Sequence, residues 1–264
     1  MREVTVGKLT FGMGQMKICV PVCAATLPEA LTEIQAIQKS PADLIEWRVD
    51  YFTEDILMAA PAIHSAAGEL PVLGTFRTKR EGGEREIGAA EYFALNLALG
   101  KLGVPMLDLE LKMCQENQQL AQETIAALHG MGAKLVISSH DFEKTPPRQE
   151  LLERYRAMRE DFDGDLPKIA VMPNIPRDVM CLLSAMTEAA PNCGPLIGIS
   201  MGELGKMTRV RGGAFGSVLT FATVGKASAP GQFSAEELAE LLSGHAGHHD
   251  HDHHGHHHGH GHHH

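Results

Sequence analysis

A lysine lies inside the short apolar segment LPKIAVMPN, where isoleucine, valine and methionine between two prolines predict a buried strand. Strand side chains alternate in direction, which puts Lys168 on one face with Ala170 and Met172. Ile169 and Val171 take the opposite face. An amine that burial and nearby cations keep neutral attacks carbonyl groups and forms an imine. Lys168 is therefore a candidate nucleophile.

Charged residues gather on one face of other expected strands as well. In LIEWRVDYF one face carries Glu46, Arg48 and Asp50, and the other carries Ile45, Trp47, Val49 and Tyr51. Asp108 and Glu110 share a face of LDLEL, and Arg77 lies near the end of PVLGTFRT. Burying such charges is costly unless they are paired. A structural ion-pair network or a strand facing water would also give this pattern, but its recurrence favours a polar interior.

A histidine completes this set, because His140 ends the expected strand VISSHDF. An iminium on Lys168 would withdraw electrons and acidify the neighbouring C–H group. His140 could take that proton and return it to a leaving group, and arginines could hold a substrate carboxylate. The residues by themselves indicate Schiff-base lyase or aldolase chemistry and do not choose between the two.

Eight apolar runs alternate with amphipathic segments, which is the count of a (β/α)8 TIM barrel. The expected strands cover residues 17–24, 43–50, 71–78, 105–111, 133–142, 167–173, 195–202 and 216–223. The expected helices cover residues 27–39, 54–67, 88–101, 115–130, 147–161, 176–190, 203–208 and 234–243. A doubly wound sheet is the alternative, but the first strand–helix junction has no G-x-G-x-x-G. Residues 4–14 predict a short hairpin that caps one end of the barrel.

Composition narrows the class of protein. The chain has 264 residues, 44% hydrophobic residues and a formal net charge of −10, which speaks against binding to nucleic acid or to an anionic membrane. It contains no apolar run long enough to span a membrane and no apolar secretory segment near Met1. The five cysteines are widely spaced, so we expect small apolar side chains in a reducing compartment, the cytoplasm.

The last twenty residues differ from the rest, because they hold thirteen of the sixteen histidines. We expect a barrel domain over residues 1–244 and a disordered tail over residues 245–264. Imidazole-rich tracts bind zinc, nickel or copper, so the tail is a candidate for transition-metal binding. It is not expected to be the active site.

The chain resembles the type I 3-dehydroquinate dehydratase family over nearly all of residues 1–244. The resemblance rests on EWRVDYF, TFRTKREGGE, DLEL, SSHDFEKTP, PKIAVMP, GAFGS and KASAPGQ, which occur in family order. It implies the dehydration of 3-dehydroquinate to 3-dehydroshikimate in the shikimate pathway, through a lysine imine, with no cofactor and no metal. It also implies a homodimer, as is common in the family.

The resemblance assigns roles to individual residues. Lys168 matches the Schiff-base lysine, His140 the general acid and base, and Glu81 the acid that orients the histidine. The residues that match substrate contacts or pocket walls are Glu46, Arg48, Arg77, Arg209, Met201, Phe221, Ser228 and Gln232. Of these, Arg209 is the one expected to grip the substrate carboxylate, whereas Ser228 and Gln232 belong to a loop that closes over the substrate.

Two positions depart from the family pattern. Pro21 replaces a small polar residue, so one substrate contact is expected to be lost or moved. The residue before His140 is a serine where an asparagine is expected. Two other functions stay open: another class I Schiff-base aldolase or lyase, and a metal-binding carrier that acts through the histidine-rich tail.

Overall fold

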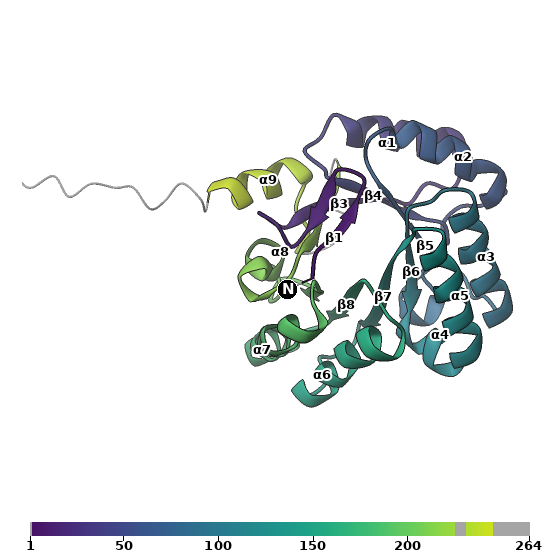
Figure 1. The fold of residues 1–264 in the computed structure, drawn as a ribbon. Coiled ribbons are helices and arrows are strands. Elements are labelled where there is room, and N and C mark those ends of the chain that lie inside the picture. The colour runs from purple at the N-terminus through teal and green to yellow at the C-terminus, as the bar shows by residue number, and fades with distance from the viewer. Residues whose placement is uncertain (1, 225–230, 245–264) are drawn as a thin grey trace, which may run out of the picture.

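The computed structural model describes residues 2–224 and 231–244, which form a barrel of parallel strands surrounded by helices (Figure 1). Within these residues the main sheet has eight parallel strands in the order β10-β3-β4-β5-β6-β7-β8-β9. The strands are β3 (Lys17–Val22), β4 (Leu44–Arg48), β5 (Val72–Thr75), β6 (Met106–Glu110), β7 (Lys134–Asp141), β8 (Leu166–Val171), β9 (Ile197–Ser200) and β10 (Leu219–Phe221). The edge strands of this sheet are β9 and β10. Directly before these two strands begin, the amide of Val218 donates to the carbonyl of Leu196 at 2.9 Å. The sheet is therefore a nearly closed barrel, and the (β/α)8 prediction is confirmed.

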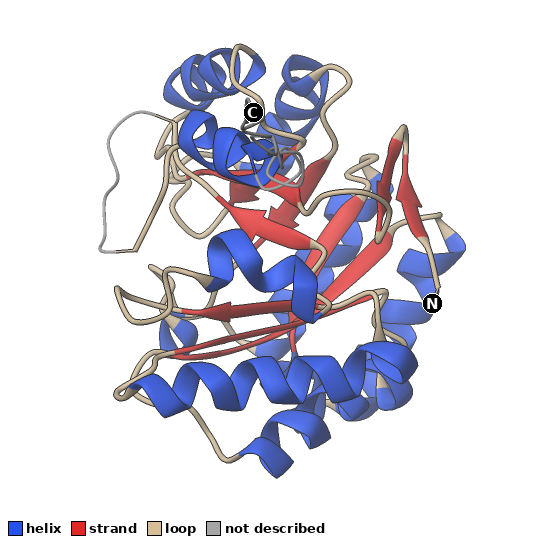
Figure 2. Ribbon diagram, turned by 90° about the vertical axis from the view of Figure 1, so that its left-hand side faces the viewer, coloured by secondary structure: helices blue, strands red, loops and turns tan. Residues whose placement is uncertain are grey.

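The helices lie outside the strands and follow them in alternation (Figure 2). They are α1 (Leu27–Gln38), α2 (Ile56–Ala67), α3 (Ala89–Lys101), α4 (Leu111–Glu116), α5 (Gln118–Gly130), α6 (Arg148–Arg156), α7 (Pro176–Cys193), α8 (Thr208–Arg211) and α9 (Ala235–Gly244). Side-chain oxygens cap two of the first helices: Asp55 accepts from the amide of Met58 at 3.1 Å, and Thr26 from that of Glu29 at 3.4 Å. Such caps satisfy amides that have no partner inside the helix.

Three expected helices differ from the structure. The segment 115–130 is divided between α4 and α5, because Asn117 leaves the helical conformation with φ −139° and ψ 54°. The segment 147–161 ends in the π-helical turn η2 (Ala157–Asp161). The helix expected at 203–208 is wrong: those residues form a turn, and the short α8 begins at Thr208. Gly205 there comes so close to the backbone of Ser200 that no Cβ would fit.

The barrel interior is layered. At the amino-terminal ends of the strands, the hairpin of β1 (Val4–Val6) and β2 (Leu9–Phe11) packs its Val4, Val6 and Phe11 against inward side chains such as Leu44 and Leu166. The predicted hairpin cap is thus confirmed. The next inward positions are polar and buried: Glu46, Thr75, Asp108, Ser138 and Lys168. Parallel strands covered on both faces explain why outward positions such as Trp47 are also fully buried.

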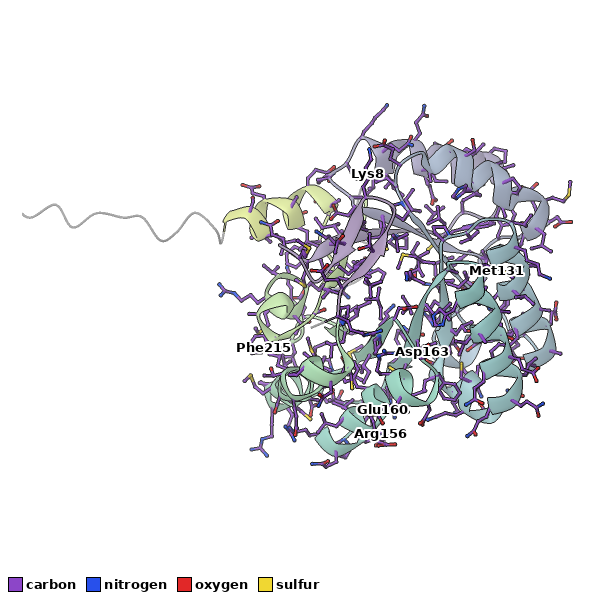
Figure 3. All side chains as sticks on the ribbon, viewed as in Figure 1. Lys8, Met131, Arg156, Glu160, Asp163 and Phe215 are labelled. Carbon is purple, nitrogen blue, oxygen red and sulfur yellow. The ribbon has the colours of Figure 1, made fainter. Side chains whose placement is uncertain are left out.

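Other charged side chains lie on the outer surface, as the labelled Lys8, Arg156 and Glu160 show in Figure 3. No helix within the described ranges 2–224 and 231–244 is long and apolar enough to cross a membrane. All five cysteines are free; Cys19, Cys114 and Cys193 are buried as expected, whereas Cys23 is exposed. The histidine-rich segment 245–264 lies outside the described residues.

Candidate active site

A cavity of about 180 Å³ lies at the carboxyl-terminal ends of the barrel strands, the end where such barrels carry their active sites. Ten of the eleven predicted site residues line this inner cavity: Glu46, Arg48, Arg77, Glu81, His140, Lys168, Met201, Arg209, Phe221 and Gln232. The eleventh, Ser228, lies outside the described residues. The structure thus brings together side chains from β4, β7, β8 and β10, from α8, from the loops after β5 and β9 and from the segment before α9.

Lys168 points into this cavity from β8, between Ser138 of β7 and Ile197 of β9 in the sheet register. Its side chain is buried, and its Nζ lies 4.4 Å from the centre of the Phe221 ring. Burial is the main cause that lowers the pKa of Lys168. The Glu46 carboxylate opposes this lowering of the pKa, and the Arg77 guanidinium adds to it. The result is a larger fraction of neutral, nucleophilic amine than an exposed lysine has.

His140 and Glu81 form a pair beside the lysine. One oxygen of Glu81, Oε1, accepts the backbone amide of His140 at 2.9 Å and interacts with its ring Nδ1 at 3.1 Å. Burial, followed by the charges of Arg77 and Lys168, lowers the pKa of His140 well below its usual value. An imidazole with Nδ1–H on Glu81 is neutral and leaves Nε2 free to accept a proton.

The pKa of Glu81 moves in the opposite direction. Burial, and next the charge of Glu110, raises the pKa of Glu81 to about 8. The residue lies in the short turn η1 (Lys79–Glu81), which the following Gly82 ends with φ +89°. Near neutral pH both members of the pair are therefore held close to their uncharged forms.

Arg77 is the centre of a buried ionic network. Its Nη1 donates to Asp108, Glu110 and the hydroxyl of Ser138, each at 3.0 Å, and its Nη2 donates to Asp108 at 2.9 Å. Burial alone would lower the pKa of Arg77, but Asp108 and Glu110 raise it well above its usual range. Arg77 is thus a permanent cation, and its field disfavours protonation of Lys168 and His140.

Arg209 is a half-buried cation whose surroundings differ from those of Arg77. Its guanidinium lines the inner cavity, and in the described part of the chain its Nε has no hydrogen-bond partner. Burial is the cause that lowers the pKa of Arg209, with no described carboxylate acting against it. A half-buried guanidinium that faces a cavity and has no described acid partner is a site for a ligand anion, and its planar fork suits a carboxylate.

Several lining residues are apolar. Met201 and Phe221 lie in the cavity wall as expected, together with Ala170 and Ile199. Pro21, which replaces the expected small polar residue, also lines the cavity and offers an apolar ring there.

Phe142 lines the same cavity but was missed by the sequence analysis. Its ring stacks on that of His140, with 6.3 Å between centroids and 13° between planes. It is the last residue of the strand expected at 133–142 and is half exposed, so neither burial nor periodicity singles it out.

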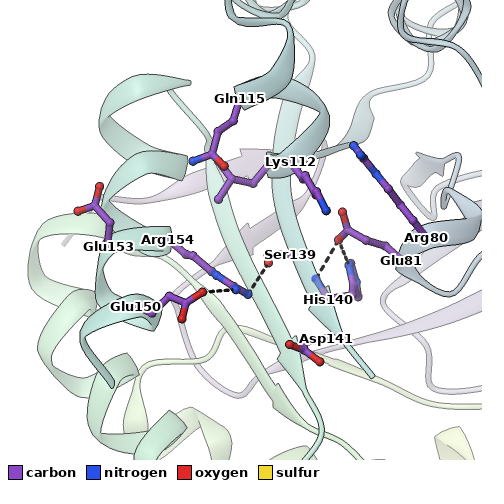
Figure 4. Close-up of a pocket in the computed structure, with 11 residues that line it drawn as sticks. Arg80, Glu81, Lys112, Gln115, Ser139, His140, Asp141, Glu150, Glu153 and Arg154 are labelled. Atoms are coloured by element: carbon purple, nitrogen blue, oxygen red, sulfur yellow. Dashed lines mark hydrogen bonds and ion pairs between the residues drawn. The ribbon is translucent and has the colours of Figure 1, made fainter. Parts of the chain in front are cut away.

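A second, outer cavity of about 480 Å³ shares Glu81 and His140 with the inner one (Figure 4). It lies between η1, α4, β7 and α6, and Lys112, Ser139 and Arg154 are among its other lining residues. Arg154 is tied to its surroundings by bonds to the Ser139 hydroxyl at 3.1 Å and to Glu150. The Glu81–His140 pair therefore lines two cavities, only one of which contains Lys168.

Comparison with known proteins agrees with this arrangement. The family model of type I 3-dehydroquinase matches residues 18–247. A curated 3-dehydroquinate dehydratase from Klebsiella pneumoniae is 42% identical over 247 residues, covering 90% of this chain and 97% of the relative. One from Syntrophotalea carbinolica is 42% identical over 251 residues, covering 92% of this chain and 98% of the relative.

Solved structures give the same result. The type I enzyme from Clostridium difficile has a TM-score of 0.87 at 37% identity and covers 92% of this chain and 97% of its own. The enzyme from Geobacillus kaustophilus has a TM-score of 0.87 at 33% identity and covers 94% and 98%. The chain belongs to the type I 3-dehydroquinase family.

Proposed function

We propose that this protein catalyses the dehydration of 3-dehydroquinate to 3-dehydroshikimate through an imine on Lys168, in the shikimate pathway of aromatic amino acid biosynthesis. The observation that carries the proposal is the placement of a buried lysine, a histidine–carboxylate pair and an arginine with no described acid partner around one cavity. Curated relatives at 42% identity are named 3-dehydroquinate dehydratase, and the Clostridium difficile relative was crystallised with covalently modified comenic acid.

Lys168 carries out the covalent part of the reaction. Its nitrogen attacks the C3 carbonyl carbon of the substrate to give a carbinolamine. The carbinolamine hydroxyl then takes up one proton from solvent and leaves as water, which gives a protonated imine. The lowered pKa of Lys168 supplies the neutral amine for this attack. The face of the Phe221 ring, 4.4 Å from Nζ, then stabilises the positive charge of the iminium.

His140 moves the proton. Its Nε2 takes a proton from C2, and the C–H electrons enter the conjugated enamine. The enamine electrons then form the C1–C2 double bond as the C1 hydroxyl leaves with a proton from His140, which yields water. Glu81 holds Nδ1 and, when ionised, stabilises the transient imidazolium. Hydrolysis of the imine by one water releases the product and restores Lys168.

The other lining residues bind and orient the substrate. Arg209 holds the substrate carboxylate, because it is a half-buried cation that has no described acid partner. Glu46, Arg48 and Arg77 hold the hydroxyl groups and shape the pocket, and Met201 and Phe221 form its apolar wall. Gln232 adds a substrate contact from the segment before α9. The family resemblance assigns a further contact to Ser228, which lies outside the described residues.

Trapping of the imine tests this proposal. Purified protein given 3-dehydroquinate should develop the absorbance of a conjugated enone. Borohydride added together with substrate should inactivate it and add ligand mass at Lys168, whereas borohydride alone should not. The Lys168→Met protein should gain no mass. Mass on another lysine such as Lys134, or aldol cleavage products without enone absorbance, would contradict the proposal and favour an aldolase.

We also infer a homodimer in the cytoplasm. The family resemblance supports the dimer, and the five free cysteines suit a reducing compartment. Light scattering after size-exclusion chromatography should give twice the chain mass of 28.6 kDa. A monomeric mass would contradict the dimer.

The histidine-rich segment 245–264 is proposed to bind transition metals without taking part in the reaction. A chain that ends at Gly244 should keep its dehydratase activity and lose nickel or zinc binding. Loss of activity in this chain, with metal capacity as the only measurable property of the full one, would favour the metal-carrier alternative.

A further inference from the structure

Asp50 lies just after β4, and its carboxylate accepts four hydrogen bonds. Oδ1 accepts from Nε of Arg48 at 2.9 Å and from the amide of Arg77 at 3.2 Å. Oδ2 accepts from Nη2 of Arg48 at 2.9 Å and from the amide of Glu84 at 3.1 Å. The carboxylate is fully buried and is not one of the groups that line the inner cavity. One buried anion thus binds three separate parts of the chain.

The two bonds to Arg48 fix a guanidinium that does line the cavity. They engage its Nε and Nη2 in a bidentate pair, and the ring of Tyr51 lies 5.0 Å from its Cζ. Within residues 2–224 and 231–244, Nη1 makes no hydrogen bond, so its N–H groups remain for a ligand. Arg48 is held in place before any substrate arrives, which reduces the entropy lost on binding.

The two backbone bonds fix the loop that carries Glu81. The amides of Arg77 and Glu84 lie on either side of Glu81 in the sequence, and both donate to the same carboxylate. Arg85 adds a bond from its Nε to the carbonyl of Asp50 at 3.0 Å. The loop is therefore tied to Asp50 at both ends.

We propose that Asp50 is a positioning residue for the dehydration, acting on the substrate through Arg48 and on His140 through the Glu81 loop. This inference rests on the proposed function. Although burial opposes ionisation, the bonds from Arg48 and the two amides lower the pKa of Asp50, so it keeps its charge near neutral pH. A neutral amide in its place would present N–H donors to donors.

Asp50→Asn tests the proposal, with Asp43→Asn as the matched control. Asp43 lies just before the opposite end of β4 and accepts the amide of Ile18 at 2.8 Å. Asp50→Asn should lower kcat/KM about a hundredfold, because small displacements of oriented groups cost that much. KM should rise because Arg48 is no longer held in place for the substrate. The value of kcat should fall because the loop that carries Glu81 is no longer fixed beside His140. Asp43→Asn should leave kcat/KM within about twofold of wild type, and a loss equal to that of Asp50→Asn would overturn the proposal.

A double-mutant cycle distinguishes positioning from general loss of structure. In an Arg48→Ala background, Asp50→Asn should raise KM much less than it does alone, because the group it positions is gone. The proposal would be overturned if the KM of the double variant rose by the product of the two single increases. It would also be overturned if Asp50→Asn kept wild-type kcat/KM.

A measurement on the wild-type chain covers the case in which Asp50→Asn does not fold. The Nε–H of Arg48 should give a resolved NMR signal that exchanges slowly with water, unlike that of the exposed Arg177. Equally fast exchange at both arginines would overturn the anchoring. Absence of dehydratase activity in the wild type would refute the proposed function instead and leave this measurement intact.

Discussion

Oε1 of Glu81 interacts with two nitrogens of His140, the backbone amide at 2.9 Å and the ring Nδ1 at 3.1 Å. The carboxylate therefore fixes the position of the strand end and the tautomer of the ring at once. The loop that carries Glu81 is itself tied to Asp50 at both ends. Catalysis thus depends on contacts that reach well beyond the groups that face the substrate.

Glu81→Gln should remove the rise of kcat between pH 7 and 9. The pKa of Glu81 is raised to about 8, so ionised Glu81 increases as pH rises from 7 to 9, and wild-type kcat should increase with it. Glutamine keeps the acceptor oxygen and loses the charge. We expect kcat at pH 9 to fall about a hundredfold and to be flat over this range. Glu84→Gln, an exposed change in the same loop, should keep the wild-type pH profile of kcat. If kcat of Glu81→Gln still rises between pH 7 and 9, the assignment of this rise to Glu81 is wrong.

Arg209→Met should make the protein more stable and less active. Burial of a guanidinium without a described acid partner is unfavourable, so its removal should raise the free energy of unfolding by about 1 kcal/mol and Tm by about 3 °C. Loss of a charge-assisted bond to the substrate should lower kcat/KM about a hundredfold. The exposed Arg211→Met should change neither quantity. Activity lost in Arg211→Met and kept in Arg209→Met would show that Arg211, and not Arg209, binds the substrate carboxylate.

Glu46→Gln should lower the pKa of Lys168 further. The Glu46 carboxylate raises the pKa of the lysine against the effect of burial, and the amide removes that charge. The bond from the Thr75 hydroxyl to Oε2 of Glu46, 3.0 Å long, can be replaced by one to the amide oxygen. Competitive labelling with acetic anhydride should show Lys168 becoming reactive at a lower pH than in wild type, with exposed Lys112 unchanged. A shift to higher pH would contradict the electrostatic account.

Period-two alternation predicted the barrel interior because its physical cause is local. A strand covered on both faces must send alternate side chains to the helices and to the barrel axis, so Glu46, Asp108 and Lys168 were placed correctly. The rule ends where the strand ends. Tyr51, expected beside Trp47, lies in a turn against Arg48 instead.

Pairing and close approach could not be predicted, because both depend on residues far apart in the sequence. The segment alone does not reveal that Gly205 lies against Ser200, and a helix was expected there. Nor does spacing reveal which acid binds which arginine. Asp50 forms an ion pair with Arg48, whereas Asp108 and Glu110 form ion pairs with Arg77. The family resemblance named Glu81 and Arg209, but the contacts around Asp50 and Phe142 are visible only in three dimensions.

Gly82→Ala should disturb the Glu81–His140 pair by steric contact with Phe142. Gly82 has φ +89°, and an added Cβ would collide with the Phe142 ring that stacks on His140. Gly103→Ala is the matched control, because Gly103 has φ +92° and no atom within 4 Å of an added Cβ. Both changes should cost about 1 kcal/mol of stability through backbone strain. Only Gly82→Ala should also lower kcat, and adding Phe142→Ala should relieve the collision but not the strain. Equal kcat in the two glycine variants would show that Phe142 does not hold the pair.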